Sequence, residues 1–136
     1  MTTRRAAIVY ARIALGSAFL SAVAARFGLW DHRAHAFAQF VSYTGDVLSF
    51  VPRAAIPLFA IAATIAEVTL GVLLIFGIRI RWTAPASAML LAMFAISMAI
   101  SFGVQSPLDY SVFSASSAAL LLYATSESPQ SSSSPG

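Results

Sequence analysis

The sequence predicts an all-α integral membrane protein, a four-helix bundle with a short interfacial helix between its first two spans. The first observation is composition: 59% of the 136 residues are hydrophobic and 10% are charged, whereas soluble domains carry about 25% charged residues. The second is a set of four apolar runs, each near the roughly 20 residues that cross a bilayer as a helix. We expect spans at about 7–27, 54–76, 83–102 and 107–125, between a cytoplasmic segment 1–6 and a disordered serine-rich tail 126–136.

The first apolar run resembles a secretory signal peptide at first sight. Arg4 and Arg5 precede it, and Ala22-Val23-Ala24 is similar to a cleavage site. Arg12 interrupts the run, which is also longer than the roughly 7–15 apolar residues of a signal peptide, so we expect a retained helix. Alanines recur on one face at the spacing that lets membrane helices approach closely. This first alanine seam consists of Ala7, Ala11, Ala14, Ala18, Ala22 and Ala25.

The segment 28–53 is the longest part of the chain that contains many polar residues. Its aromatic residues recur at roughly helical spacing, which predicts an amphipathic helix at the membrane surface with these rings at headgroup level. They are Phe37, Phe40 and Tyr43. His32 and His35 stand near Asp31 without a third strong ligand, a pattern typical of a solvated loop, and we expect no metal site there.

Glu67 is a carboxylate in the middle of the second span. Inserting a charged side chain there costs a few kcal/mol or more, so Glu67 is expected to face the protein interior and to have a partner or a chemical task. On a helical wheel it shares a small, partly polar face with Ala60, Ala63, Thr64, Gly71 and Leu74. Two interpretations stay open. Glu67 exchanges protons or contacts a quinone, or it fastens helices by bonding to a Ser, a Thr or Arg12.

Arg12 and Thr64 complete the set of intramembrane polar candidates. Measured from the cytoplasmic ends of the predicted helices, Arg12 lies ~7 Å and Glu67 ~13 Å deep at 1.5 Å per residue. An arginine side chain can cover that difference, so an Arg12–Glu67 pair is feasible. The alternative is that Arg12 extends to the inner headgroups while its aliphatic stem stays in the bilayer.

The third span carries a second alanine seam, and Pro85 stands in its first turn, where proline is tolerated. This second seam consists of Ala84, Ala88, Ala92, Ala95 and Ala99. Ser106 is expected to cap the fourth span, with Pro107 at the first helical position and Asp109 favourable to the helix dipole. Asp109 and Tyr110 are therefore a cap and an interfacial aromatic, or the outer gate of a polar cavity.

The eight basic residues are all arginine, and their distribution predicts the orientation of the chain. With four spans, the arginines of the segments 1–6 and 77–82 lie on one side almost without acids, so both termini are expected in the cytoplasm. No basic stripe suggests nucleic acid as a partner. Cysteine is absent, which excludes thiolate and disulfide chemistry and iron–sulfur ligation. A redox role would therefore need a bound quinone, a haem or a partner subunit.

The arrangement of glycine, arginine and glutamate over residues 8–125 resembles the DoxX family of small bacterial membrane proteins. The motif runs Arg12-x-x-Leu15-Gly16-x-x-Phe19-Leu20, then Glu67-x-x-x-Gly71-x-x-Leu74-x-x-Gly77-x-Arg79. Where many members have a glycine-lysine element after the first helix, this chain has Ala25-Arg26-Phe27-Gly28. The resemblance implies a four-helix bundle in the bacterial inner membrane, with quinone as the cofactor to consider.

Three functions of different classes remain open. The resemblance favours a non-catalytic or quinone-associated subunit of a membrane oxidoreductase system, docked to a soluble or membrane partner. The alternatives are a small-solute or proton-coupled transporter and a membrane assembly or chaperone subunit. Small multidrug transporters have a similar size but place their key carboxylate in the first helix, where this chain has Arg12. The lipid bilayer is a partner in every case, and a homo-oligomer is left open.

The predicted topology places Ala34 outside the cell and Ser133 in the cytoplasm. Fusions of alkaline phosphatase and green fluorescent protein at these two residues test it. We expect phosphatase activity only from the Ala34 fusion and fluorescence only from the Ser133 fusion. If both fusion points were found on the same side of the membrane, the prediction of four spans would be refuted.

Overall fold

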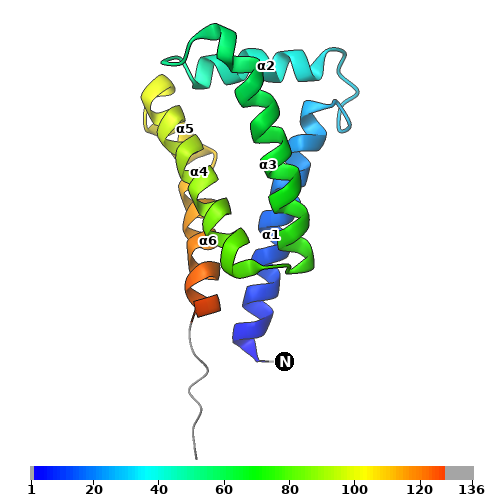
Figure 1. Ribbon diagram of the computed structural model, residues 1–136, viewed down its shortest axis with the longest axis vertical. Coiled ribbons are helices and arrows are strands. Elements are labelled where there is room, and N and C mark those ends of the chain that lie inside the picture. Colours follow the sequence, from blue (N-terminus) through cyan, green and yellow to red (C-terminus); the bar gives the residue numbers. More distant parts are fainter. Residues whose placement is uncertain (1, 128–136) are drawn as a thin grey trace, which may run out of the picture.

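The computed structural model describes residues 2–127 and contains, within them, six α-helices and one short 3-10 helix (Figure 1). The elements are α1 Thr3–Arg26, α2 Ala36–Val47, η1 Arg53–Ala55, α3 Ile56–Phe76, α4 Ile80–Phe102, α5 Gln105–Asp109 and α6 Val112–Glu127. The predicted disordered tail lies outside this part of the chain except for its first two residues, which end α6. The class is all-α, as predicted.

Three of the described helices are long and apolar enough to cross a membrane, which makes the chain a multi-pass membrane protein. These spans are Thr3–Arg26, Arg53–Phe76 and Ile80–Phe102, close to the predicted first three. At 16 residues, α6 is shorter than the roughly 20 that a perpendicular span requires. A fourth crossing, and with it the orientation of the termini, stays a prediction.

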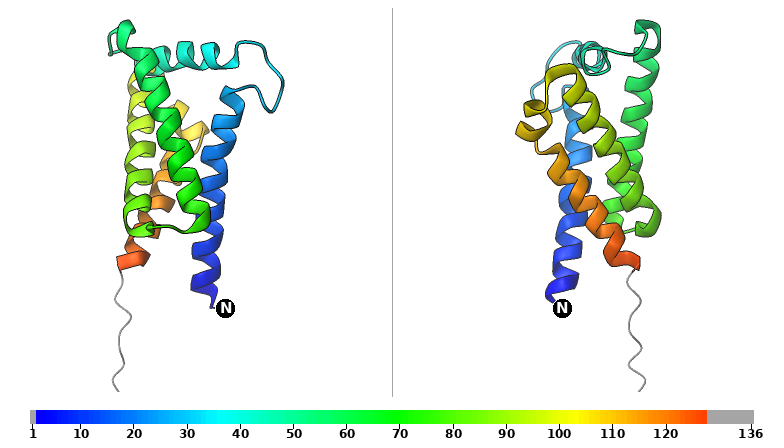
Figure 2. Two further views of the ribbon diagram at one scale, coloured as in Figure 1. Left: turned by 45° about the vertical axis from the view of Figure 1, so that its right-hand side comes forward. Right: turned by 90° about the vertical axis from the view of Figure 1, so that its left-hand side faces the viewer.

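The helices form two antiparallel pairs, α1 with α3 and α4 with α6, and α2 lies across one end of both (Figures 1 and 2). The start of α1 and the end of α6 lie at the opposite end from α2 (Figure 2). The helix expected between the first two spans is therefore present as α2. It begins at Ala36 after a left-handed His35 and buries Ala36, Thr44 and Val47 against the bundle.

Two hydrogen bonds and a ring contact hold α2 in this position. The hydroxyl of Ser101 near the end of α4 donates to the carbonyl of Val47 at 2.6 Å and lies 2.8 Å from the hydroxyl of Ser49. At the other end of α2, the rings of Phe27 and Phe37 stack with centroids 5.5 Å apart. These contacts fix α2 across the end of the two helix pairs.

The close approach of α1 and α3 depends on two glycines. A Cβ added to Gly16 would lie 2.7 Å from the carbonyl oxygen of Gly71, and one added to Gly71 would lie 3.1 Å from that of Gly16. The first alanine seam, predicted as a face for close helix approach, lies mostly outside this contact, because Ala7, Ala14 and Ala18 are exposed. Alanine already carries the Cβ that this contact excludes, and an apolar methyl facing lipid costs little.

The second alanine seam does pack inward, as predicted. Ala84, Ala88 and Ala95 of α4 are buried against α6. The hydroxyl of Ser116 in α6 donates to the carbonyl of Ala88 at 2.9 Å and so links the two helices. Small side chains on α4 allow this approach, as is usual between membrane helices.

The single helix predicted over 107–125 is instead two helices with a break between them. Ser106 is not the cap, because α5 begins one residue earlier at Gln105 without a side-chain cap hydrogen bond. The amides of Tyr110 and Ser111 close turns onto Ser106 and Leu108, and Ser111 has a φ of 56°. A left-handed residue ends an α-helix, so α6 starts afresh at Val112 with a new direction.

A methyl group at Gly16 tests the close contact. We expect Gly16→Ala to lower the free energy of unfolding by about 1–3 kcal/mol, because the added Cβ meets a backbone oxygen that cannot move aside. Gly45→Ala is the matched control, since a Cβ there would lie 3.7 Å from Ile56, an ordinary van der Waals distance. Thermal unfolding in detergent followed by circular dichroism measures both. Equal stability of the two variants would contradict the assignment.

Candidate functional site

Glu67 forms an ion pair with Arg26 inside the upper half of the bundle, the half nearer α2. The Oε2 atom of Glu67 is in contact with Nη1 of Arg26, and the two residues are 4% and 9% exposed. Nη1 also donates to the hydroxyl of Thr64 at 3.1 Å, and that hydroxyl donates to the carbonyl of Ala60 at 2.8 Å. The carboxylate is therefore neutralised by a charge from another helix, as its depth requires.

One nitrogen of Arg26 serves two acceptors. Nη1 lies against Oε2 of Glu67 in the ion pair, and it also donates to the hydroxyl of Thr64. The Cζ atom of Arg26 lies 3.8 Å from the ring centre of Phe40, a cation–π distance. Phe40 thus covers the pair from the side of α2.

The helical register brings the two charges together. Arg26 lies on the buried face of α1 with Leu15, Phe19 and Val23. Along α1, Arg26 stands ten residues, or ~15 Å, from Gly16 toward α2. Along α3, Glu67 stands four residues, or ~6 Å, from Gly71 in the same direction. An extended arginine side chain spans the remaining distance. Sequence reasoning missed this partner, although Arg26 continues the 4-4-3 spacing of the buried face of α1.

Arg12 does not pair with Glu67, so the pair that the sequence made feasible does not form. Arg12 stands ~6 Å from the glycine contact on the opposite side from Glu67, so the two groups are separated by ~12 Å along the helices. Its Nε and Nη2 donate to the carbonyls of Leu74 and Ile75 at 3.0 and 3.1 Å. The guanidinium therefore caps the C-terminal end of α3, where a cation is favourable.

The position of Arg12 explains the glycine that follows α3. A Cβ at Gly77 would lie 2.3 Å from Nη2 of Arg12, and its φ of 69° is left-handed. The backbone conformation therefore favours glycine here, and a side chain at this position would also displace the guanidinium from the two carbonyls. The depth of Arg12 was underestimated because α1 begins at Thr3, four residues before the predicted start.

A cavity of about 250 Å³ adjoins the ion pair beneath α2. Its walls come from α1, α2, α3, α4 and the junction of α5 with α6, and they are mainly apolar or aromatic. They comprise Arg26, Phe40, Tyr43, Thr44, Val47, Leu48, Glu67, Leu91, Phe94, Met98, Tyr110 and Val112. A mostly apolar cavity with a few convergent polar groups is the usual form of a small-molecule site.

The two candidate residues predicted at the outer face, Asp109 and Tyr110, have different surroundings. Tyr110 is 71% exposed and lines the cavity, whereas Asp109 is exposed and accepts a hydrogen bond from Gln105 at 3.4 Å. Tyr43 stands at the same mouth as Tyr110. Burial raises the pKa of the Tyr43 phenol above its ordinary value, and the nearby Tyr110 adds to this, so the phenol stays a hydrogen-bond donor at neutral pH.

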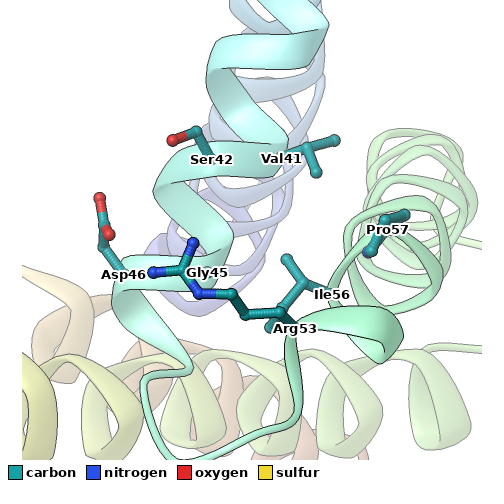
Figure 3. Close-up of a pocket in the computed structure, with 7 residues that line it drawn as sticks. All are labelled: Val41, Ser42, Gly45, Asp46, Arg53, Ile56 and Pro57. Atoms are coloured by element: carbon teal, nitrogen blue, oxygen red, sulfur yellow. The ribbon is translucent and has the colours of Figure 1, made fainter.

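A second hollow, of about 200 Å³, lies on the other side of α2 where it meets η1 and the start of α3. Figure 3 shows Arg53 extending toward α2 near Asp46, with Ile56 and Pro57 as its apolar wall. Both charged residues are exposed to solvent. This hollow is a surface feature separate from the buried pair.

Within residues 2–127, no cluster of three or more His, Asp or Glu side chains could hold a metal ion. Both His32 and His35 adopt left-handed φ angles, 53° and 59°, in the turn between α1 and α2. Asp31 forms an ion pair with Arg33 in the same turn. The groups that the site presents are an ion pair, hydroxyls and aromatic rings.

Residues 4–110 match a family model described as methylamine utilisation protein MauE. The match covers more than half of the chain, so the chain belongs to this family of membrane proteins. No curated protein and no solved structure matches the chain significantly.

The resemblance to the DoxX family is wrong, and the family match replaces it. The residues that carried it have structural roles in the α1–α3 pair: Gly16 and Gly71 permit close contact, and Gly77 accommodates Arg12. Any two antiparallel membrane helices that pack closely need small residues of this kind. Their order and spacing therefore indicate helix packing and do not distinguish one family from another.

Neutralising the buried pair tests its contribution to the fold. We expect Arg26→Gln and Glu67→Gln each to lower the free energy of unfolding by about 3–5 kcal/mol, because each leaves one buried charge unpaired. The double variant removes both charges and should lose less than either single variant. Arg33→Gln is the matched control, because its ion pair is exposed and worth about 0–1 kcal/mol.

Unfolding of the four variants in detergent, followed by circular dichroism, provides these values. Losses in the double variant that equal the sum of the two single losses would show that Arg26 and Glu67 do not act as a pair.

Proposed function

We propose that this member of the MauE family is a membrane accessory protein that supports the assembly of a redox enzyme system. The observation that carries the proposal is the family match over residues 4–110. The family is linked to maturation of the methylamine dehydrogenase system, which favours the assembly role among the three functions left open by the sequence. The enzyme whose assembly it supports would then act in the oxidation of methylamine or a related amine.

The composition of the chain supports an accessory role. Its 136 residues include no cysteine, so the chain does not itself exchange disulfides with a client protein. Of the two arginines of α1 that contact α3, Arg26 is held in the ion pair with Glu67 and Arg12 in capping of the helix end. This arrangement favours a stable scaffold in the bilayer over a catalyst of group transfer.

The end of the bundle that carries α2 is the face on which a client or partner would dock. Exposed charged and polar side chains gather there, in contrast to the apolar sides of the bundle. They include Asp31, Arg33, Gln39, Asp46 and Arg53. In the predicted orientation, this face lies on the outer side of the inner membrane, where it would meet an exported enzyme subunit.

Deletion of the gene, with and without complementation, tests the role during growth on methylamine as nitrogen source. We expect the subunits of the amine-oxidising enzyme to fall in abundance while their transcripts are unchanged, because unassembled subunits are degraded. Complementation by the parent chain should restore both abundance and activity. Normal levels of active enzyme in the deletion strain would refute the proposal.

Purification of the finished enzyme separates an assembly factor from a permanent subunit. An assembly factor is absent from the active complex and crosslinks to its subunits only during synthesis. A stoichiometric copy of this chain in the active complex would instead support the redox-subunit alternative.

A further inference from the structure

Two opposite charges line the hollow between α2 and the start of α3 without pairing with each other. Asp46 lies near the end of α2 and Arg53 is the first residue of η1, and the hollow between them measures about 200 Å³. Figure 3 shows the Arg53 side chain extended toward α2. Within residues 2–127, neither charged side chain forms an ion pair or a hydrogen bond with another residue. Both groups therefore keep their full capacity to bind a ligand from outside this part of the chain.

The rest of the hollow combines a hydroxyl with a small apolar wall. Ser42 stands one turn before Asp46 on the same face of α2, and both residues are exposed. Gly45 adds no side chain, and Ile56 and Pro57 form the opposite wall (Figure 3). A volume of about 200 Å³ is below the roughly 300–1,000 Å³ of drug-sized sites, so the hollow suits a small charged group.

The hollow stands at the end of an apolar stripe of α3 that faces the lipid. Arg53 is the first residue of the span Arg53–Phe76, which places the hollow at the level of the headgroups. From Pro57 toward the other end of α3, exposed apolar side chains recur at the spacing of one helix face. This α3 stripe consists of Ile61, Ile65, Val68 and Val72. A molecule whose polar head occupies the hollow can therefore extend an apolar chain along the stripe.

The two charges match a zwitterionic headgroup better than an ion of one sign. An anion bound to Arg53 would lie near the carboxylate of Asp46, and a cation bound to Asp46 would lie near the guanidinium, so each would be repelled. A phosphoethanolamine group carries a phosphate and an ammonium on one short link, so it supplies a counter-charge to both residues.

Hydrogen bonding favours a primary ammonium over a methylated one. A guanidinium binds phosphate through parallel hydrogen bonds, which suits Arg53. A primary ammonium has three N–H donors for the oxygens of Asp46 and Ser42. A trimethylammonium group has no N–H donor, so it would leave these acceptors without hydrogen bonds.

We propose that the hollow between α2 and α3 binds the headgroup of a phosphatidylethanolamine molecule. Arg53 binds the phosphate, Asp46 and Ser42 accept hydrogen bonds from the ammonium, and an acyl chain lies along the α3 stripe. The bound lipid joins α2 to the start of α3 at headgroup level. This site is separate from the buried ion pair and does not depend on the proposed assembly role, so its test requires no client protein.

Lipid binding to the purified full chain tests the site. The chain is delipidated in detergent and titrated with phosphatidylethanolamine, phosphatidylcholine or phosphatidylglycerol of identical acyl chains, and native mass spectrometry measures the bound fraction. We expect phosphatidylethanolamine to bind at least about tenfold more tightly than either other lipid, which corresponds to 1.4 kcal/mol. Phosphatidylglycerol lacks the ammonium, and phosphatidylcholine lacks its N–H donors. Affinity for phosphatidylethanolamine no greater than for either other lipid overturns the proposal.

Variants at the two charged residues locate the binding. Arg53→Gln removes the partner of the phosphate and should weaken phosphatidylethanolamine binding at least about tenfold. Asp46→Asn removes the partner of the ammonium and should abolish the preference over phosphatidylglycerol. Arg33→Gln is the matched control, because Arg33 is exposed at the same end of the bundle and does not line this hollow. Parental binding in either hollow variant overturns the site, as does an equal loss in the control.

Glycerophosphoethanolamine, the same headgroup without acyl chains, distinguishes a lipid from a soluble ligand. We expect it to displace phosphatidylethanolamine only in large excess, because it has no chain to contact the α3 stripe. Displacement at equal concentration would overturn the assignment to a lipid, since a soluble compound with phosphate and ammonium groups would then be the ligand.

Discussion

The ion pair between Arg26 and Glu67 is the interaction on which the upper half of the bundle depends. Taking either charge out of water costs several kcal/mol, and only the partner in the low-dielectric interior offsets this. The pair therefore ties the end of α1 to the middle of α3. Through the contact of Arg26 with Phe40 it also fixes α2 over the bundle. Packing, topology and the candidate site thus meet at one pair of charges.

The pair requires the glycine contact between α1 and α3. Close approach of the two backbones at Gly16 and Gly71 sets the register that leaves Arg26 and Glu67 within reach of each other. The same register carries Arg12 to the other end of α3, where its guanidinium satisfies two terminal carbonyls. Two arginines in one helix therefore have different tasks because they lie on opposite sides of one contact.

The space that these contacts enclose gives the family membership a structural context. In the proposed assembly role, the protein would need stability in the bilayer and a polar face toward its client, and the exposed polar side chains at the α2 end would provide that face. The cavity beneath α2 adjoins this buried pair.

The sequence by itself determined the class and the positions of the first three long helices. Apolar run length decides whether a helix can span a bilayer, and this property is local. The small face around Glu67 was also predictable, because it follows from helical periodicity: Ala60, Thr64, Gly71 and Leu74 are buried together with the carboxylate. The cost of an unpaired charge in lipid made it clear that Glu67 needed a partner.

The tertiary structure alone decided which partner this was. Arg12 and Arg26 both lie on the inward side of α1, and only the register of α1 against α3 selects Arg26. Likewise the first alanine seam and the Gly16 position were both plausible contact faces. A missing Cβ allows the closer backbone approach, so glycine is at the contact and most of the seam faces outward. The break at Ser111 depends on a left-handed residue that neither propensity nor hydropathy indicates. Contacts between helices join residues that are far apart in the sequence, so local sequence patterns do not reveal them.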